Sequence, residues 1–123
     1  MTVSSQKRPL VVDDDPAVLE SVRRVLALDG HALQCAPDAE QALTALGRSR
    51  FDLLVTDYLL PGTNGLRLAE TAKEKGRCRS VLMITAFPQE NPPAAIDLLL
   101  LKPFSVDSLR GGVWQLLNTS RLN

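Results

Sequence analysis

Four short apolar runs in this chain each end at a polar side chain that can carry chemistry. Runs of this length are typical of buried strands in a parallel sheet, and the carboxyl ends of such strands meet at one edge. In open α/β sheets that edge is where ligands bind. We therefore expect the polar positions to form a site for a divalent cation and a phosphoryl group. They are Asp13 and Asp14 after LVV, Asp57 after LLVT, Thr85 after VLMI and Lys102 after LLLL.

Strand-like and helix-like segments alternate along the chain. This alternation predicts an α/β fold, in which helices cover both faces of a parallel sheet and the crossovers are right-handed. Strands are predicted at 10–12, 31–35, 53–56, 81–84 and 98–101. The second of these is more polar than the others, as an edge strand would be.

Local signals predict where the helices begin and end. Asp15, Asn64 and Ser105 are suited to cap helices, because their side-chain oxygens can accept hydrogen bonds from the first free amides. Gly47 is predicted to stop the second helix. The segment 60–65 is predicted to be a loop, since its proline and glycines disfavour both helix and strand.

Length and charge narrow the class of protein. A chain of 123 residues favours one domain, here predicted over 9–118, with a flexible leader at 1–8 and a tail at 119–123. The net charge of zero argues against a generic binder of nucleic acid or of anionic membranes. The polar start is unlike a signal peptide, and no apolar run is long enough to span a bilayer. With two cysteines at no metal-binding spacing, a cytoplasmic protein is expected.

The carboxylates suggest metal-assisted phosphoryl chemistry. Two such charges about 4 Å apart repel by roughly 4 kcal/mol at an effective dielectric constant near 20, so a cluster of three calls for a cation. Mg²⁺ prefers oxygen ligands. Asp15 is explained by helix capping, which leaves Asp13 and Asp14 for the metal. A carboxylate such as Asp57 is a competent nucleophile toward phosphorus.

The ordered set of motifs resembles the receiver domain of two-component response regulators and hybrid histidine kinases. The resemblance rests on VVDDDP at 11–16, TDYLLPGTNG at 56–65, TA at 85–86 and KPF at 102–104. Each motif alone is weak, but the set is specific because every member falls at a strand end. The resemblance implies a doubly wound, five-stranded parallel sheet of the flavodoxin-like order 2-1-3-4-5.

The resemblance also implies a role for each site residue. Mg²⁺, for which Mn²⁺ could substitute, would be the cofactor, and the phosphoryl group would come from a histidine kinase or a phosphotransfer protein. Such a domain is a phospho-acceptor in a phosphorelay and not an enzyme, although it assists its own phosphorylation and dephosphorylation. The implied roles are Asp57 as acceptor; Asp13, Asp14, Asp57 and the backbone carbonyl of Leu59 as metal ligands; Thr85 and Lys102 as phosphoryl-binding switch residues; and Pro103 as a cis-proline.

The chain departs from the family pattern in two places. Only 16 residues separate Thr85 from Lys102, and prolines interrupt them, so the family's fourth helix is predicted to be missing or reduced to a turn. Leu99 stands where the family has its switch aromatic. In the family, the fourth helix, fifth strand and fifth helix form the common output and dimer face. The signal is therefore expected to be read differently, with a homodimer still allowed. C-terminal receivers of hybrid histidine kinases often share the shortened segment.

Two other functions are weighed against phospho-acceptance. The altered output face suggests a phosphorylation-independent interaction module on the same scaffold, although every residue needed for phosphoryl chemistry is present. A phosphatase or other hydrolase could also use a nucleophilic aspartate with Mg²⁺. The acceptor candidate Asp57 follows the third strand, however, whereas in those hydrolases the nucleophile follows the first. Little inserted sequence is available to build a substrate pocket, so the hydrolase ranks last.

Overall fold

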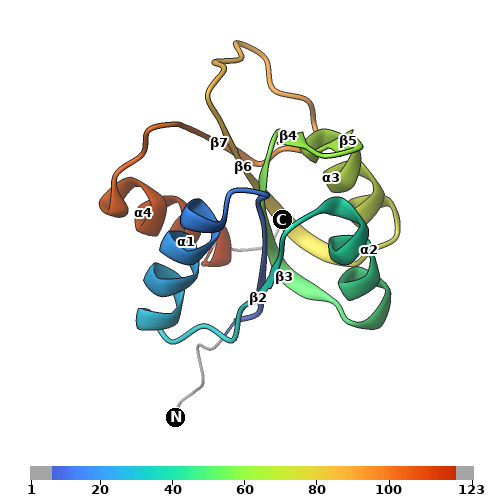
Figure 1. The fold of residues 1–123 in the computed structure, drawn as a ribbon, viewed down its shortest axis with the longest axis horizontal. Coiled ribbons are helices and arrows are strands. Elements are labelled where there is room, and N and C mark those ends of the chain that lie inside the picture. Colours follow the sequence, from blue (N-terminus) through green and yellow to red (C-terminus); the bar gives the residue numbers. More distant parts are fainter. Residues whose placement is uncertain (1–6, 119–123) are drawn as a thin grey trace.

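A computed structural model describes residues 7–118 of the chain and shows a parallel sheet with helices on both faces (Figure 1). The sheet has five strands in the order β2-β1-β3-β6-β7, which is the predicted order 2-1-3-4-5. All its neighbouring strands are parallel. The strands are β1 (Pro9–Val12), β2 (Gln34–Ala36), β3 (Phe51–Asp57), β6 (Cys78–Thr85) and β7 (Leu98–Leu101). A separate two-stranded hairpin, β4 (Leu59–Leu60) with β5 (Thr63–Asn64), follows β3.

Four helices in the described part of the chain complete the fold. The predicted caps are present: the side chains of Asp15, Asn64 and Ser105 each accept a hydrogen bond from a backbone amide in the first turn of a helix. The helices are α1 (Pro16–Leu28), α2 (Ala39–Arg48), α3 (Gly65–Glu74) and α4 (Val106–Leu117). Since no helix lies between β6 and β7, α4 occupies the place of the family's fifth helix.

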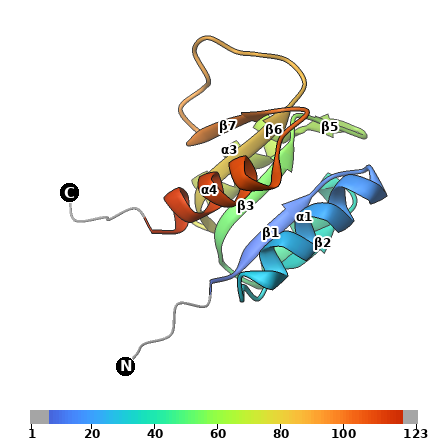
Figure 2. The same cartoon turned by 90° about the vertical axis from the view of Figure 1, so that its left-hand side faces the viewer.

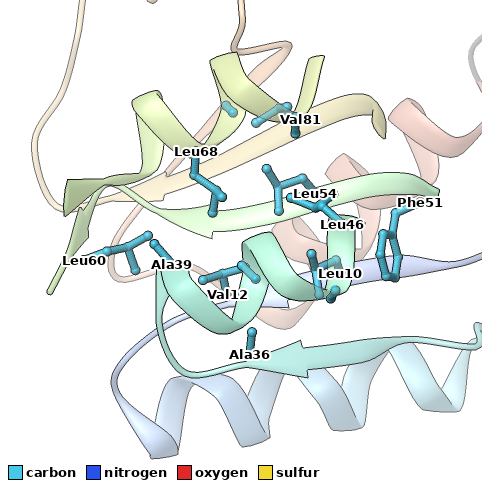
Figure 3. Packing of buried hydrophobic residues seen from close by; sticks show 14 of the residues in the cluster. Leu10, Val12, Ala36, Ala39, Leu46, Phe51, Leu54, Leu60, Leu68 and Val81 are labelled. Carbon is cyan, nitrogen blue, oxygen red and sulfur yellow. The ribbon is translucent and has the colours of Figure 1, made fainter. Parts of the chain in front are cut away.

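Two apolar clusters hold the helices to opposite faces of the sheet. One lies under α2 and α3 and is built from alternate strand residues such as Leu10, Leu54 and Val81 (Figure 3). The other lies under α1 and α4 and includes Val22 and Leu109. Because both faces are buried, the central strands carry continuous apolar runs such as residues 53–55 and 81–84. The acidic cluster follows these strands at their carboxyl ends, where Asp13 and Asp14 come after β1 and Asp57 ends β3.

Two predicted boundaries are wrong. Strand β2 begins at Gln34, not at residue 31, because the His31 amide donates to the Leu26 carbonyl and so still belongs to the end of α1. Helix α2 continues through Gly47 to Arg48. Its last carbonyls are satisfied by Arg77, whose guanidinium donates to the Leu46 carbonyl at 2.6 Å, so glycine is not needed as a stop. The predicted loop at 60–65 also contains most of the β4–β5 hairpin.

The connection between β6 and β7 lacks the family's fourth helix, as predicted. Residues 86–97 arch away from the sheet and return without regular structure (Figure 2). The return is anchored by Asp97, whose carboxylate accepts from the Val81 amide at 2.8 Å and from Lys73 at 2.6 Å. This carboxylate takes the place that a strand carbonyl would occupy beside β6.

The two ends of the described chain lie close together, away from the strands' carboxyl ends. Lys7 and Asn118 line the same cavity of about 450 Å³, which also borders Trp114. Lys7 accepts from the Ala32 amide, and the Arg8 amide donates to Asp52 at 2.7 Å. Residues 1–6 of the predicted leader and the predicted tail 119–123 lie outside the described residues. Within 7–118, no helix has the length and hydropathy needed to cross a bilayer.

Candidate functional site

Three carboxylates converge at the carboxyl edge of the sheet. Asp13 and Asp14 directly follow β1, and Asp57 is the last residue of the neighbouring strand β3. One oxygen from each lies within 4.8 Å of the others. Asp13 is buried, Asp57 is partly buried and Asp14 is exposed, so the cluster is open to solvent on one side. Oxygen atoms at this spacing match the donor set of a hard divalent cation.

Lys102 joins the cluster from the end of β7. Its ammonium donates to Asp57 Oδ2 at 3.0 Å and lies 3.7 Å from Asp13 Oδ2. Burial disfavours the charged form, but the hydrogen bond to Asp57 and the charges of Asp13 and Asp57 outweigh it and raise the pKa of Lys102. The lysine is therefore an ammonium at neutral pH. Its single positive charge leaves the cluster of three carboxylates with an excess of negative charge.

The pKa of Asp13 reflects both its burial and the charged groups around it. Burial raises the pKa of its carboxyl above the ordinary value, and the nearby Asp57 and Asp14 charges add to the increase. The Asp15 amide, which donates to Asp13 Oδ1 at 2.8 Å, and the Lys102 ammonium act in the opposite direction. A desolvated carboxylate among like charges is stabilised by a bound cation. The residues present therefore fit a metal ion.

Thr85 and Leu59 lie beside the carboxylates at strand ends. Thr85 is buried as the last residue of β6, and its hydroxyl accepts from the Phe87 amide at 3.1 Å. Leu59, two residues beyond Asp57, begins the β4–β5 hairpin and has a side chain exposed to solvent. The Lys102–Pro103 peptide bond is cis, the geometry that the resemblance implies. The fold thus gathers the predicted residues at one edge.

The chain's sequence and fold match a known family. The model of the response regulator receiver domain matches residues 10–113, which is most of the chain. The chain belongs to this family. The receiver domain is generally a signalling phospho-acceptor and not an enzyme, and receivers partner with histidine kinases.

Individual relatives support the assignment. The response regulator MprA of Mycobacterium leprae is 34% identical over 119 residues, which cover 93% of this chain and 52% of that protein. The receiver therefore spans about half the length of the curated relatives it matches. A CheY-like receiver from Methanospirillum hungatei superposes with a TM-score of 0.85 at 27% identity, covering 92% of this chain and 94% of that one.

A further solved relative bears on the metal. The response regulator TrrA of Thermotoga maritima, solved in complex with Mg²⁺-BeF, is 31% identical to this receiver, with a TM-score of 0.79. The alignment covers 90% of this chain and 99% of that one. The acidic triad of Asp13, Asp14 and Asp57 is consistent with a Mg²⁺ site in this receiver as well.

One residue that shapes the surroundings of Asp57 was not predicted from the sequence. Gly65, the first residue of α3, lies against the backbone of Asp57, and a β-carbon there would collide with the Asp57 carbonyl oxygen. Its amide donates to the Tyr58 carbonyl at 2.7 Å. The glycine lets α3 begin directly against the backbone of Asp57. Its position one residue after the Asn64 cap was a visible signal, but only the fold shows what it approaches.

Proposed function

We propose that this receiver accepts a phosphoryl group on Asp57 in a Mg²⁺-dependent step of a two-component phosphorelay. The observation that carries the proposal is the hydrogen bond between Lys102 and Asp57 Oδ2 inside a cluster of three carboxylates. That contact orients one acceptor oxygen. The other oxygen remains for attack on phosphorus.

Transfer would proceed by nucleophilic substitution at phosphorus. An Asp57 oxygen forms the new P–O bond while the bond from phosphorus to the donor's imidazole nitrogen breaks, and the bonding pair remains on the imidazole. A cation held by Asp13, Asp14, Asp57 and the Leu59 carbonyl, Mg²⁺ or Mn²⁺ in its place, would neutralise charge on the transferring group. The same arrangement would let the domain assist later hydrolysis of its own acyl phosphate.

Thr85 and Lys102 would hold the transferred group. Lys102 is already charged and within hydrogen-bond distance of Asp57, so it can pair with a phosphoryl oxygen. The Thr85 hydroxyl accepts from the Phe87 amide and keeps its own proton to donate. We assign these two residues as the phosphoryl-binding pair of the switch.

The donor would be a histidine kinase or a phosphotransfer protein. A largely apolar groove of about 670 Å³ runs beside Lys102, between α1 and the start of α4, where Val18 and Phe104 line it. An apolar surface of a protein donor could pack there while its histidine reaches Asp57.

We place the boundaries of the receiver domain at residues 9 and 118. The described thiols Cys35 and Cys78 are both free, which suits the reducing cytoplasm.

The test is phosphorylation by acetyl phosphate in the presence of Mg²⁺, read by intact-protein mass spectrometry. The wild-type protein should gain one phosphoryl group, and Asp57→Asn should gain none. Asp52→Asn is the matched control, because Asp52 lies in the same strand β3 but bonds to the Arg8 amide instead of the site. A phosphoryl group on the Asp57→Asn protein would refute the assignment of the acceptor.

The second candidate is a phosphorylation-independent interaction module. It is favoured by the absence of a helix between β6 and β7 in the described chain, since that helix belongs to the family's output face. Calorimetric titration with Mg²⁺, combined with the phosphorylation assay, separates the two functions. A protein that neither binds Mg²⁺ nor forms an acyl phosphate would be a binding module.

A further inference from the structure

A cavity of about 450 Å³ lies at the end of the molecule where the described chain begins and ends, opposite the carboxyl edge of the sheet. It is bordered by α1 and α4, which lie side by side on one face of the sheet (Figure 1). A volume of this size is typical of sites for small molecules. Nothing in the proposed function uses this cavity, although charged and aromatic side chains line it: Lys7, Asp29, His31, Arg110 and Trp114.

The lining carries an excess of positive charge. Asp29, the C-cap of α1, is paired with Arg110 of α4, whose Nε donates to Asp29 Oδ2 at 3.0 Å and whose Nη2 donates to Oδ1 at 2.8 Å. This pair cancels one charge of each sign and fixes the plane of the guanidinium, while Nη1 takes no part in it. Among residues 7–118 the Lys7 ammonium has no ion pair, so its charge is left over. An anion is therefore the ligand that this lining favours.

Two aromatic rings border the same space. Trp114 is the single tryptophan of the chain and is 68% exposed, so its indole offers a flat apolar face on which another ring can stack. His31 Nδ1 is buried and has no hydrogen-bond partner in the described part of the chain. The imidazole can therefore bond to a polar group only through Nε2. Because an indole and an unpaired ammonium line one cavity, the favoured ligand is both aromatic and negatively charged.

We propose that this cavity binds a small planar anion with an aromatic ring, such as a nucleoside monophosphate or an aromatic carboxylate. The ring stacks on the Trp114 indole, and the anionic group pairs with the Lys7 ammonium. Arg110 Nη1 is a second donor for the anionic group, and the Asp29 carboxylate repels it little because that carboxylate is already paired. A cationic ligand would be repelled by Lys7, and an apolar one would cover charged groups without bonding to them.

The test is a titration of Trp114 fluorescence with AMP, adenosine, inorganic phosphate and benzoate. Since the chain has one tryptophan, the signal reports on this cavity. AMP should bind about tenfold more tightly than adenosine or phosphate, because only AMP offers both the ring and the charge. Benzoate offers both without a nucleoside, so the tighter of AMP and benzoate identifies the source of the ligand. If neither of them saturates the signal, or if adenosine binds as well as AMP, the proposal is wrong.

Two neighbouring cations provide a matched pair of variants. Lys7→Gln removes the proposed partner of the anion but keeps the backbone carbonyl that accepts from the Ala32 amide, and it should raise the Kd of the tighter ligand about tenfold. Arg8→Gln removes the same charge one residue away and should leave the Kd unchanged, because the Arg8 guanidinium lies over the Phe51 ring, 5.0 Å from its centroid, and does not line the cavity. Equal weakening by both substitutions would indicate attraction to overall charge and would overturn the proposed site.

Calorimetry supplies the readout for the aromatic ring. Trp114→Leu removes the stacking surface and should weaken binding of the same ligand about tenfold. The variant should still fold, since the Trp114 side chain is mostly exposed. Binding that both Lys7→Gln and Trp114→Leu leave unchanged would place the ligand elsewhere and overturn the proposal. None of these titrations includes a phosphoryl donor, so their outcome does not depend on the proposed function.

Discussion

Two regions of the molecule begin at the carboxyl edge of the sheet but are built differently. The first is formed by the ends of β1 and β3, and the second is the connection from β6 to β7. In the first region, Asp13, Asp14 and Asp57 are positioned by the buried strands that they follow or end. One carboxylate oxygen of each lies within 4.8 Å of the others. At the second, residues 86–97 have no regular structure and leave large side chains such as Phe87 exposed. The two regions meet at Thr85, whose hydroxyl accepts the amide of Phe87.

The difference shows that the acidic cluster and the β6–β7 connection depend on different parts of the structure. The carboxylates depend on the central strands, which are buried on both faces and tolerate little change. The β6–β7 connection depends mainly on its two ends. It lacks a helix, while Asp57 still lies with Asp13 and Asp14 at the carboxyl edge of the sheet. Substitutions of Gly65, Asp97 and Asp13 test this contrast, and their expected effects decrease in that order.

The largest effect is expected at Gly65, which lies against the backbone of Asp57. Gly65→Ala should reduce the free energy of unfolding by about 3 kcal/mol, because the new methyl group must displace the backbone of Asp57. Gly111→Ala is the matched control, since Gly111 lies in α4 with open space around it and alanine should stabilise the helix by roughly 1 kcal/mol. Urea unfolding measures both. Equal tolerance of the two substitutions would show that the backbone of Asp57 can move more freely than the contact implies.

A smaller loss is expected at the return of the β6–β7 connection. Asp97→Ala should cost about 2 kcal/mol, because the buried Val81 amide loses its acceptor. Lys73→Ala removes only the partly exposed ion pair with Asp97 and should cost less than ~1 kcal/mol. The comparison is made by urea unfolding of both variants. If Lys73→Ala proves as costly as Asp97→Ala, the ion pair and not the amide bond anchors the segment.

The smallest effect is expected at Asp13, where a substitution that removes the charge should increase the free energy of unfolding of the metal-free protein. The raised pKa of Asp13 means that the folded protein binds this proton more tightly than the unfolded chain does. The resulting stability is present below the ordinary pKa of 3.8 and is lost as pH rises through the raised value. Asp13→Asn removes that loss and should therefore raise the free energy of unfolding at neutral pH.

The same variant should lose its response to the cation. Mg²⁺ should stabilise the wild-type protein against urea, less so at acidic pH where Asp13 is protonated, and should have little effect on Asp13→Asn. Asp52→Asn, with a substitution remote from the cluster, should keep the full response. A metal-free Asp13→Asn protein less stable than wild type would mean that the hydrogen bond between Asp15 and Asp13 matters more than the repulsion.

Much of this arrangement was predictable because it depends on short-range signals. Apolar runs give the strands, polar residues at their ends give the site, and Asp15, Asn64 and Ser105 cap their helices as expected. The missing helix was also visible, since prolines interrupt a segment too short for it. These features depend on residues that are close together in the sequence, so the sequence alone is enough to predict them.

Features that depend on distant residues were not predictable. Gly47 looked like a helix stop, but Arg77, 30 residues further along the chain, binds the end of α2. The role of Asp97 depends on its meeting the Val81 amide across the sheet. The approach of Gly65 to Asp57 likewise requires the turn of the β4–β5 hairpin. In each case the partner is set by tertiary packing, and the sequence pattern around the residue carries no trace of it.

The closeness of Lys7 and Asn118 has a consequence for how such a domain can be used. Both line one cavity at the end of the molecule away from the carboxyl edge of the sheet. Polypeptide joined at either position would leave from the same side, so neighbouring modules could be attached without covering Asp57 or Lys102. The geometry suits a unit that can be inserted into, or appended to, proteins of different architecture while the carboxyl edge of its sheet stays uncovered.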